Sequence, residues 1–465
     1  MRQINSCARL TSKKARTRKL PIELGQEIEL RFHDLLSNGQ AVGRADGVAV
    51  FVFGPLPGEL ARVRISAVKQ KYAVGELKEL LERSDARAQP FCPVFGTCGG
   101  CQIQHLTYAQ QLKWKQSVVR NALQRIGGIT DVHVNETIGM SNPRAYRNKM
   151  SLVVNHPDGF GFYKQRSHDI VRIDRCPIVQ PALDKCIGAL IDLQNDSSSA
   201  RAFANARHVV ARTSVATGQN IIAIAAPQPA EQRKQISSSM LERLPNAAGV
   251  VESFDLSSEN AILGQKMRAL AGTDSIEEVV GGIRFHISAS SFFQVNVEIL
   301  ERIFEAIRPL ASQSRRVFDL YCGGGAFALC FAKSGCEVFG IEENVKAVDE
   351  ARRNADLNNL SQRVRFRRGR VNEVLQEPAI RARLTTIDAV FLDPPRKGSD
   401  PQTLAAIAEA KVRSIWYLSC DPATLARDLK LLLPKGYRLT NVQPFDMFPQ
   451  TGHVESLALL SRTEK

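Results

Sequence analysis

The sequence has no run of about 18 consecutive apolar residues, so no membrane-spanning helix is expected. Its first segment, residues 1–20, is basic and has no apolar stretch of the kind found in a secretory signal; we expect a disordered tail there. Without such a signal, the ten cysteines do not indicate a disulfide framework, and they favour metal or redox chemistry instead. These absences exclude membrane-spanning and secreted, disulfide-rich classes, and we expect a cytoplasmic protein.

Charge is the strongest feature of the composition. The chain has 465 residues, a formal net charge of +15 and a pI near 9.5. A basic excess of this size favours polyanionic partners such as nucleic acid, because phosphate contacts release counterions on binding. The alternative is ordinary solubility charge. The length predicts two or three domains.

The chain divides into four predicted parts. Residues 1–20 form the tail, and residues 21–82 read as short strands around an Asp46-Gly47 hairpin turn. A small barrel of the OB type fits that segment. Residues 83–290 begin with a cysteine- and glycine-rich loop and a helix from about Tyr108 to Ile126, then mix strands and loops. Residues 291–465 alternate strands and helices.

This alternation in residues 291–465 predicts an α/β fold with a Rossmann-like, mostly parallel sheet. The predicted parallel strands are Val317–Tyr321, Val338–Ile341, Val364–Phe366, Ala389–Leu392 and Ile415–Leu418. Leu439–Phe445 and Ser456–Leu460 are predicted to form an antiparallel hairpin at one edge.

Three of these strand ends predict a cofactor crevice. Tyr321 precedes a Cys-Gly-Gly-Gly turn, Glu342 ends the next strand, and Asp393 follows the fourth strand. The turn lacks the G-x-G-x-x-G spacing of a nicotinamide dinucleotide site. Glu342 lies where an acidic residue can bind ribose hydroxyls, and the layout resembles the S-adenosylmethionine methyltransferase sheet. The alternative is a glycine turn that only connects a strand to a helix.

A candidate nucleophile, Cys420, follows the fifth strand at the same crevice. A thiolate that adds to C6 of a pyrimidine makes C5 nucleophilic enough to accept a methyl group. A general base must then remove the C5 proton, and Glu455, at the start of the last strand, is the candidate. A buried, unreactive Cys420 is the alternative, and Cys322 competes for the role because it also lies at the crevice.

Four other cysteines predict a metal site. Cys92, Cys98 and Cys101 have C-x5-C-x2-C spacing, and Cys176 follows beside a proline. This pattern favours an iron–sulfur centre. Structural zinc is the alternative, although the second C-x2-C pair usual in zinc sites is missing.

The sequence resembles the RNA uracil-5-methyltransferases over about residues 22–460. The shared motifs are Cys92-x5-Cys98-x2-Cys101 with Cys176, Ser291-Phe292-Phe293-Gln294-Val295-Asn296, the glycine loop, Asp393-Pro394-Pro395-Arg396, Ser419-Cys420-Asp421-Pro422 and His453-Val454-Glu455. The resemblance implies that Gln294, Tyr321, Glu342 and Asp393 contact S-adenosylmethionine, that Cys420 is the nucleophile and that Glu455 is the base.

The resemblance also implies a TRAM domain at residues 21–82 and a [4Fe-4S] cluster in a central α+β domain, 83–290. This combination is similar to the bacterial 23S ribosomal RNA enzymes, so the expected partner is 23S rRNA, at a uridine in an unpaired loop or bulge that can be flipped out. We expect a monomer. The sequence departs from the family pattern at Ala326, where Asn is common, and at Gly369-Arg370, where a polar or acidic residue is usual.

Three alternatives remain at this stage. The same reaction could act on tRNA. The sheet could methylate a base nitrogen, although such enzymes favour an aromatic residue where this chain has Arg396. Finally, the barrel and the cysteines could belong to a non-catalytic RNA-binding protein, because a fold alone does not establish an activity.

Overall fold

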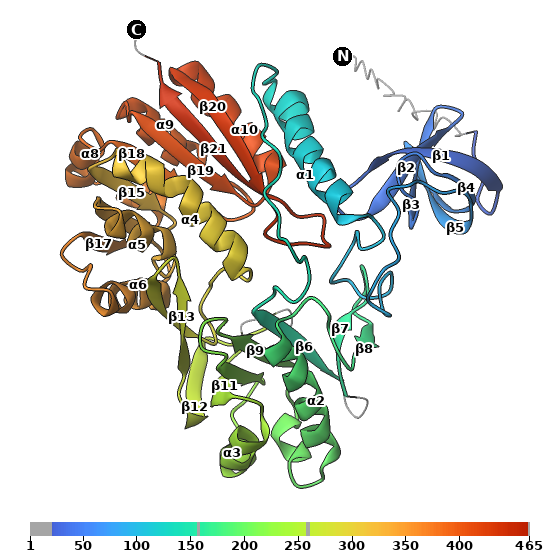
Figure 1. Ribbon diagram of the computed structural model, residues 1–465, viewed down its shortest axis with the longest axis horizontal. Coiled ribbons are helices and arrows are strands. Elements are labelled where there is room, and N and C mark those ends of the chain that lie inside the picture. Colours follow the sequence, from blue (N-terminus) through green and yellow to red (C-terminus); the bar gives the residue numbers. More distant parts are fainter. Residues whose placement is uncertain (1–20, 156–158, 257–260, 464–465) are drawn as a thin grey trace, which may run out of the picture. The chain divides into compact units, whose positions relative to one another are not determined.

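The computed structural model describes residues 21–155, 159–256 and 261–463. These residues form two compact units, which meet in the sequence between Arg87 and Ala88 (Figure 1). The predicted tail, residues 1–20, lies outside the described residues. Among the described helices, none is both long and apolar enough to cross a bilayer.

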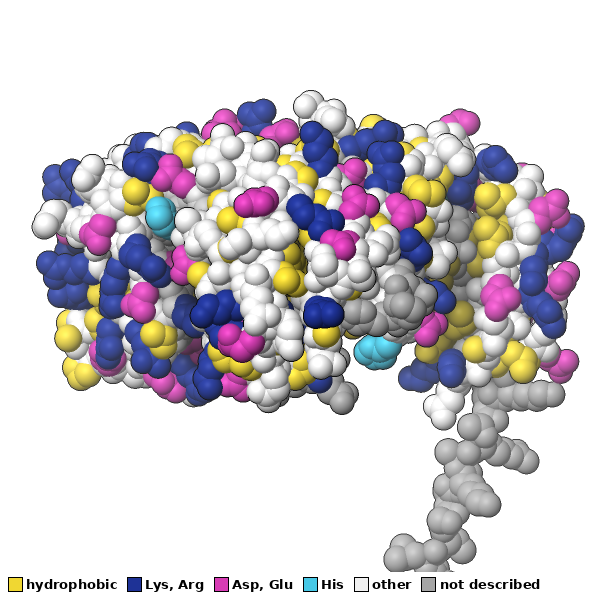
Figure 2. Space-filling view, turned by 90° about the horizontal axis from the view of Figure 1, so that it is seen from below, with side chains coloured by type: hydrophobic (Ala, Val, Ile, Leu, Met, Phe, Trp, Pro, Cys, Tyr) yellow, Lys and Arg dark blue, Asp and Glu magenta, His cyan; other side chains and the backbone are white. Residues whose placement is uncertain are grey.

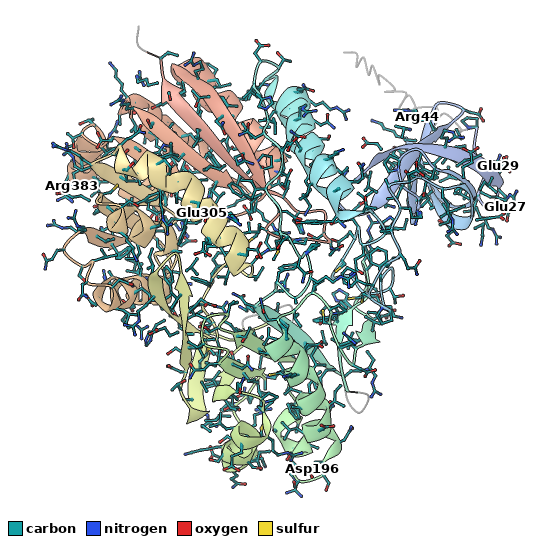
Figure 3. All side chains as sticks on the ribbon, viewed as in Figure 1. Glu27, Glu29, Arg44, Asp196, Glu305 and Arg383 are labelled. Carbon is teal, nitrogen blue, oxygen red and sulfur yellow. The ribbon has the colours of Figure 1, made fainter. Side chains whose placement is uncertain are left out.

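The first unit is the predicted barrel. Its strands are β1 (Glu27–Leu35), β2 (Gln40–Ala45), β3 (Val48–Phe53), β4 (Leu60–Val68) and β5 (Tyr72–Glu82). They close in the order β1-β2-β3-β5-β4. Side chains of β3 alternate between buried and half-buried, as expected for a strand with one face on the core. Exposed Glu27, Glu29 and Arg44 project outward (Figure 3). The barrel expected from the sequence is confirmed.

The second unit contains a central sheet and a C-terminal sheet. The central elements are β6 (Lys149–Asn155), β7 (Gly159–Tyr163), β8 (Ile170–Arg172), α2 (Pro181–Asn195), η2 (Ala200–Phe203), β9 (His208–Thr213), β10 (Asn220–Ala225), α3 (Glu231–Arg243), β11 (Ala247–Phe254) and β12 (Lys266–Gly272). The seven strands follow the order β12-β11-β10-β9-β6-β7-β8. Buried side chains of α2 and α3 pack on the sheet in one apolar cluster. A separate hairpin, β13 (Ser275–Val280) and β14 (Ile283–Ser288), follows.

The C-terminal part has helices on both faces of its sheet (Figure 1). Its strands are β15 (Arg316–Leu320), β16 (Glu337–Glu342), β17 (Val364–Arg368), β18 (Ala389–Leu392), β19 (Ser414–Ser419), β20 (Tyr437–Phe445) and β21 (Glu455–Arg462). Its helices are α4 (Val297–Ser312), α5 (Ala326–Lys333), α6 (Val345–Leu357), α7 (Val371–Val374), α8 (Pro378–Leu384), α9 (Pro401–Glu409), α10 (Pro422–Leu432) and η3 (Leu433–Lys435). Helix α1 (Tyr108–Ala122) and the π-helical turn η1 (Leu123–Gly127) precede the central sheet in the sequence.

This sheet has the order β17-β16-β15-β18-β19-β21-β20. The first five strands are parallel, and β21 and β20 form the predicted antiparallel hairpin at one edge. The predicted α/β class and all five predicted parallel strands are confirmed. Strand order reverses between β15 and β18, and ligands of such sheets bind in the crevice at this point. The carboxyl ends of β15, β16, β18 and β19 therefore meet at one edge.

Candidate active site

The turn between β19 and α10 fixes the position of Cys420. Asp421 caps α10, because one carboxylate oxygen accepts hydrogen bonds from the backbone N–H groups of Ala423 (2.8 Å) and Thr424 (3.0 Å). Pro422 occupies the first helical turn, where its missing N–H costs nothing. Ser419 Oγ donates to Asp421 O at 3.0 Å and braces the turn. A cap, a proline and a hydroxyl thus hold Cys420 at the strand end, half-buried.

Strand register brings Glu455 to Cys420. Ser419 of β19 pairs with Ser456 of the antiparallel β21, so the next residue of one strand lies opposite the preceding residue of the other. Glu455 is 4% exposed. Burial, followed by the charge of Asp393, raises the pKa of Glu455 to about 8, and Arg396 opposes this shift. The carboxyl group can therefore exchange a proton near neutral pH, as a general base requires.

Cys420 is a protonated thiol in this environment. Burial, then the carboxylates of Glu455 and Asp393, raise its pKa to about 12, whereas Arg396 lowers it. The N-terminus of α10 favours a thiolate, but burial and the two carboxylates outweigh it. Cys420, Glu455 and Asp393 thus interact electrostatically at one edge of the sheet.

The glycine turn after β15 leaves open space beside Glu342. Gly323 N donates to Glu342 Oε2 at 3.1 Å, which joins the ends of β15 and β16. A Cβ at Gly323 would have no neighbour within 4 Å, and one at Gly324 would meet only Glu350 Oε2, at 3.8 Å. Tyr321 has a left-handed backbone (φ 68°) that turns the chain out of the sheet. The turn can therefore accept a ligand against its backbone.

Asp393, a third predicted cofactor contact, lies at the same edge. Asp393 N donates to Leu320 O at 3.3 Å, so Asp393 directly adjoins the end of β15. Burial raises the pKa of Asp393 to about 7. Gln294 is 8% exposed. Its loop is held to α6, because Ser291 Oγ donates to Glu350 Oε1 at 2.5 Å. Of the two positions that depart from the family pattern, Ala326 begins α5. At the other, Gly369 N donates to Glu342 O at 2.9 Å, and exposed Arg370 pairs with Glu343 and Glu373.

Three ionisable residues of the site, Arg396, His453 and Asp319, had no role assigned from the sequence. Arg396 Nη2 lies 3.4 Å from His453 Nε2, and burial, then Arg396, lowers the pKa of His453 to about 4. Asp319 is fully buried in β15, where burial, then Asp393 and Glu342, raise its pKa. A carboxylate within an apolar strand was the available signal for Asp319. The Arg396–His453 contact joins residues 57 apart and has no local signature.

The four predicted metal ligands come from two parts of the chain and interact electrostatically. Burial, followed by the charges of Cys176, Cys98 and Cys92, raises the pKa of Cys101 to about 12, so these four thiols lie within electrostatic reach of one another. Across residues 21–155, 159–256 and 261–463, however, no group of three or more Cys, His, Asp or Glu side chains is arranged to hold a metal ion. Cys322 is buried, and burial raises its pKa, so it is a weaker candidate nucleophile than half-buried Cys420.

Comparison with known proteins agrees with this geometry. A protein of Bacillus cereus described as an uncharacterized RNA methyltransferase is 38% identical over 460 residues, covering 96% of this chain and 98% of its own length. An uncharacterized RNA methyltransferase of Clostridium acetobutylicum is 35% identical, with 96% and 99% covered.

A solved structure is also similar over nearly the whole chain. The Pyrococcus abyssi tRNA (uracil-54, C5)-methyltransferase in complex with S-adenosyl-L-homocysteine has a TM-score of 0.73 and 26% identity, and the match covers 93% of this chain and 100% of that one. The family models for tRNA (uracil-5-)-methyltransferase and for the TRAM domain match residues 107–463 and 21–78. The chain therefore belongs to the tRNA (uracil-5-)-methyltransferase family, and it is an RNA methyltransferase with an N-terminal TRAM domain.

Proposed function

We propose that this protein transfers a methyl group from S-adenosylmethionine to C5 of a uridine in RNA. The observation that carries the proposal is the placement of Cys420 and Glu455 opposite each other at the strand edge that also carries Asp393 and the open glycine turn. The similar Pyrococcus abyssi enzyme, a uracil C5-methyltransferase solved with S-adenosyl-L-homocysteine, supports both the reaction and the methyl donor.

The proposed reaction uses two side chains in sequence. S-adenosylmethionine, when bound, supplies an electrophilic methyl group. Cys420 gives its thiol proton to solvent, and its sulfur adds to C6 of the uracil ring, which makes C5 nucleophilic toward that methyl group. Glu455 then takes the C5 proton, and the bond between Cys420 and C6 breaks to restore the double bond and the thiolate. The methyl donor would bind in the open space above Gly323 and Gly324. The residues that would hold it there are Gln294, Tyr321, Glu342 and Asp393.

We propose 23S rRNA as the substrate, with a uridine in an unpaired loop or bulge as the target. The barrel together with the four gathered cysteines supports this choice, and tRNA remains the second candidate because the Pyrococcus abyssi enzyme acts on it. Lys and Arg side chains are spread among acidic ones over the visible face in Figure 2. Since they form no single stripe there, charge alone does not choose between the two RNAs.

Mass spectrometry of separated RNA fractions tests the function and the substrate together. Cells that lack this protein are expected to lose one 5-methyluridine from 23S rRNA and to retain those of tRNA. Loss from tRNA instead would contradict the ribosomal substrate but not the reaction. No change in 5-methyluridine, or loss of a base methylated on nitrogen, would contradict the reaction.

Gly324→Val is expected to weaken binding of the methyl donor without disturbing the fold. The new side chain would enter the open space above the turn, and the nearest atom to its Cβ is Glu350 Oε2 at 3.8 Å. We expect S-adenosylhomocysteine to bind at least about tenfold more weakly, equivalent to about 1.4 kcal/mol, in calorimetry. Gly188→Val in α2 is the matched control, because its Cβ also has no neighbour within 4 Å. Equal affinity in the two variants would place the donor elsewhere.

We also propose that Cys92, Cys98, Cys101 and Cys176 hold a [4Fe-4S] cluster. Four sulfurs within electrostatic reach are a suitable donor set, and a bound cationic centre would stabilise the thiolates that burial disfavours. Anaerobically purified protein is expected to contain about four irons and four sulfides per chain and to absorb visible light. Cys101→Ala should lose this iron, whereas Cys186→Ala, a buried cysteine outside the group, should retain it. Zinc in place of iron, or neither metal, would contradict the cluster.

A further inference from the structure

The loop that precedes the proposed base is held by a distant part of the chain. This loop, residues 446–454, joins β20 to β21 and ends at Glu455. Its residues Asp446, Met447, Gln450, Thr451 and Val454 are almost completely buried. A buried loop needs hydrogen-bond partners for its backbone, and here they come largely from residues 99–115 rather than from the sheet.

Gln450 is the main point of attachment. Its carbonyl oxygen accepts hydrogen bonds from the backbone N–H groups of Gln102 (3.0 Å) and Ile103 (3.1 Å). Its own N–H donates to Gln111 Oε1 at 3.1 Å, and its side-chain oxygen accepts from Gln111 Nε2 at 3.0 Å. Gln450 has a left-handed backbone (φ 71°), which a non-glycine residue adopts only when its surroundings stabilise it. These contacts therefore determine the path of the loop.

The same contacts reach the cysteine loop. Gln102 directly follows Cys101, and its Oε1 accepts from Gly452 N at 3.4 Å while its Nε2 donates to Gly99 O at 2.8 Å. One side chain thus joins the loop that carries Cys98 and Cys101 to the residue before His453. Hydrogen bonds of 3.0 to 3.4 Å therefore connect the two loops.

A buried ion pair joins α1 to the beginning of the same loop. Lys115 and Asp446 are both fully buried and form a salt bridge, and Lys115 Nζ also donates to Phe448 O at 3.0 Å. Tyr146 OH donates to Pro449 O at 3.1 Å. The loop is therefore fixed at Asp446, Phe448, Pro449 and Gln450, only five residues before Glu455.

We propose that Gln111 and Gln102 are positioning residues for proton abstraction, which rests on the proposed role of Glu455 as the base. They hold residues 446–454 so that Glu455 remains opposite Cys420, and they couple the cysteine loop to this step. Neither glutamine touches the substrate. Displacement of a catalytic group by about 1 Å can reduce a rate about 100-fold, so loss of these bonds should affect the step that uses Glu455.

The test uses Gln111→Met, which retains side-chain volume and removes the hydrogen bonds, and Gln102→Ala, a milder change at a half-buried position. The matched control is Gln116→Met, on the same helix, whose Nε2 donates to Val134 O at 2.8 Å, away from residues 446–454. With uridine-containing substrate RNA, we expect both test variants to lower kcat about 10- to 100-fold. We also expect them to accumulate the RNA–protein adduct that survives denaturation. Affinity for S-adenosylhomocysteine should remain within about twofold of the wild type, less than 0.5 kcal/mol.

Comparison with Glu455→Gln separates the possible failures. If Glu455→Gln accumulates the adduct and both glutamine variants behave like Gln116→Met, the positioning role is wrong. A parallel loss of kcat and cofactor affinity without the adduct would also overturn it, because it would indicate general destabilisation. If Glu455→Gln itself accumulates no adduct, the assignment of the base fails instead. Should Gln111→Met not fold, Gln102→Ala decides the outcome.

Discussion

Cys420→Ala is expected to abolish methylation, with kcat lowered by about 10⁴-fold or more, as when the nucleophile of a covalent mechanism is removed. Without the sulfur, C6 has no nucleophile and C5 cannot take the methyl group. RNA that carries 5-fluorouridine at the target should form a stable complex with the wild type, because the fluorine cannot be removed as a proton. The variant should form no such complex in a denaturing gel.

Two control measurements show whether the loss of activity is specific to Cys420. S-adenosylhomocysteine should still bind Cys420→Ala, because Cys420 follows β19 whereas the open space lies above the glycine turn that follows β15. Cys322→Ala is the matched control, since Cys322 lies in that turn and is the other cysteine near the strand edge. The control should retain the 5-fluorouridine complex. A complex that persists in Cys420→Ala and disappears in Cys322→Ala would reverse the assignment.

The sequence predicted those parts of the fold that depend on local patterns. Apart from the edge strand β17, the parallel strands are mostly short apolar runs, because helices cover both of their faces, and such runs are visible in the sequence. The residues after β15, β18 and β19 could be assigned to one crevice because carboxyl ends of parallel strands meet at one edge. The same argument predicts that Cys420, Asp393 and Glu342, which ends β16, lie close together.

The contacts that join distant segments could not be predicted in this way. Gln111 and Gln450 are 339 positions apart, and neither has a local pattern that identifies its partner. The order of the central sheet, where β6 lies beside β9, likewise depends on packing between non-consecutive strands. The pKa of Glu455 depends on burial together with Asp393 and Arg396, which come from other parts of the chain. Candidate residues at strand ends can therefore be predicted from the sequence, whereas their pKa values and the contacts that hold them depend on the folded structure.

Glu455→Gln is expected to stop the reaction after methyl transfer. The amide retains the shape of the buried side chain but cannot take the C5 proton, so turnover should fall by about 10²- to 10⁴-fold. Because the sulfur has already added to C6, the methylated RNA should remain attached to Cys420. A denaturing gel with ordinary uridine-containing RNA would detect this adduct. Glu278→Gln, a buried glutamate that accepts hydrogen bonds from Val215 N and Ala216 N, is the control.

The pH dependence of activity and stability should identify the same carboxyl group. For the wild type, kcat should rise with pH through about 8, as Glu455 loses its proton, because the step that uses Glu455 follows methyl transfer; this rise should be absent from the residual activity of Glu455→Gln. The folded-state pKa of Glu455 is raised above its unfolded value, so between about pH 4.5 and 8 the folded protein binds the extra proton and stability falls as pH rises. Glu455→Gln removes this loss, and its melting temperature should exceed that of the wild type at pH 8 but not at pH 4. A variant that is less stable than the wild type at both pH values, and that accumulates no adduct, would make Glu455 a structural residue, because a buried base is expected to cost stability where it is charged.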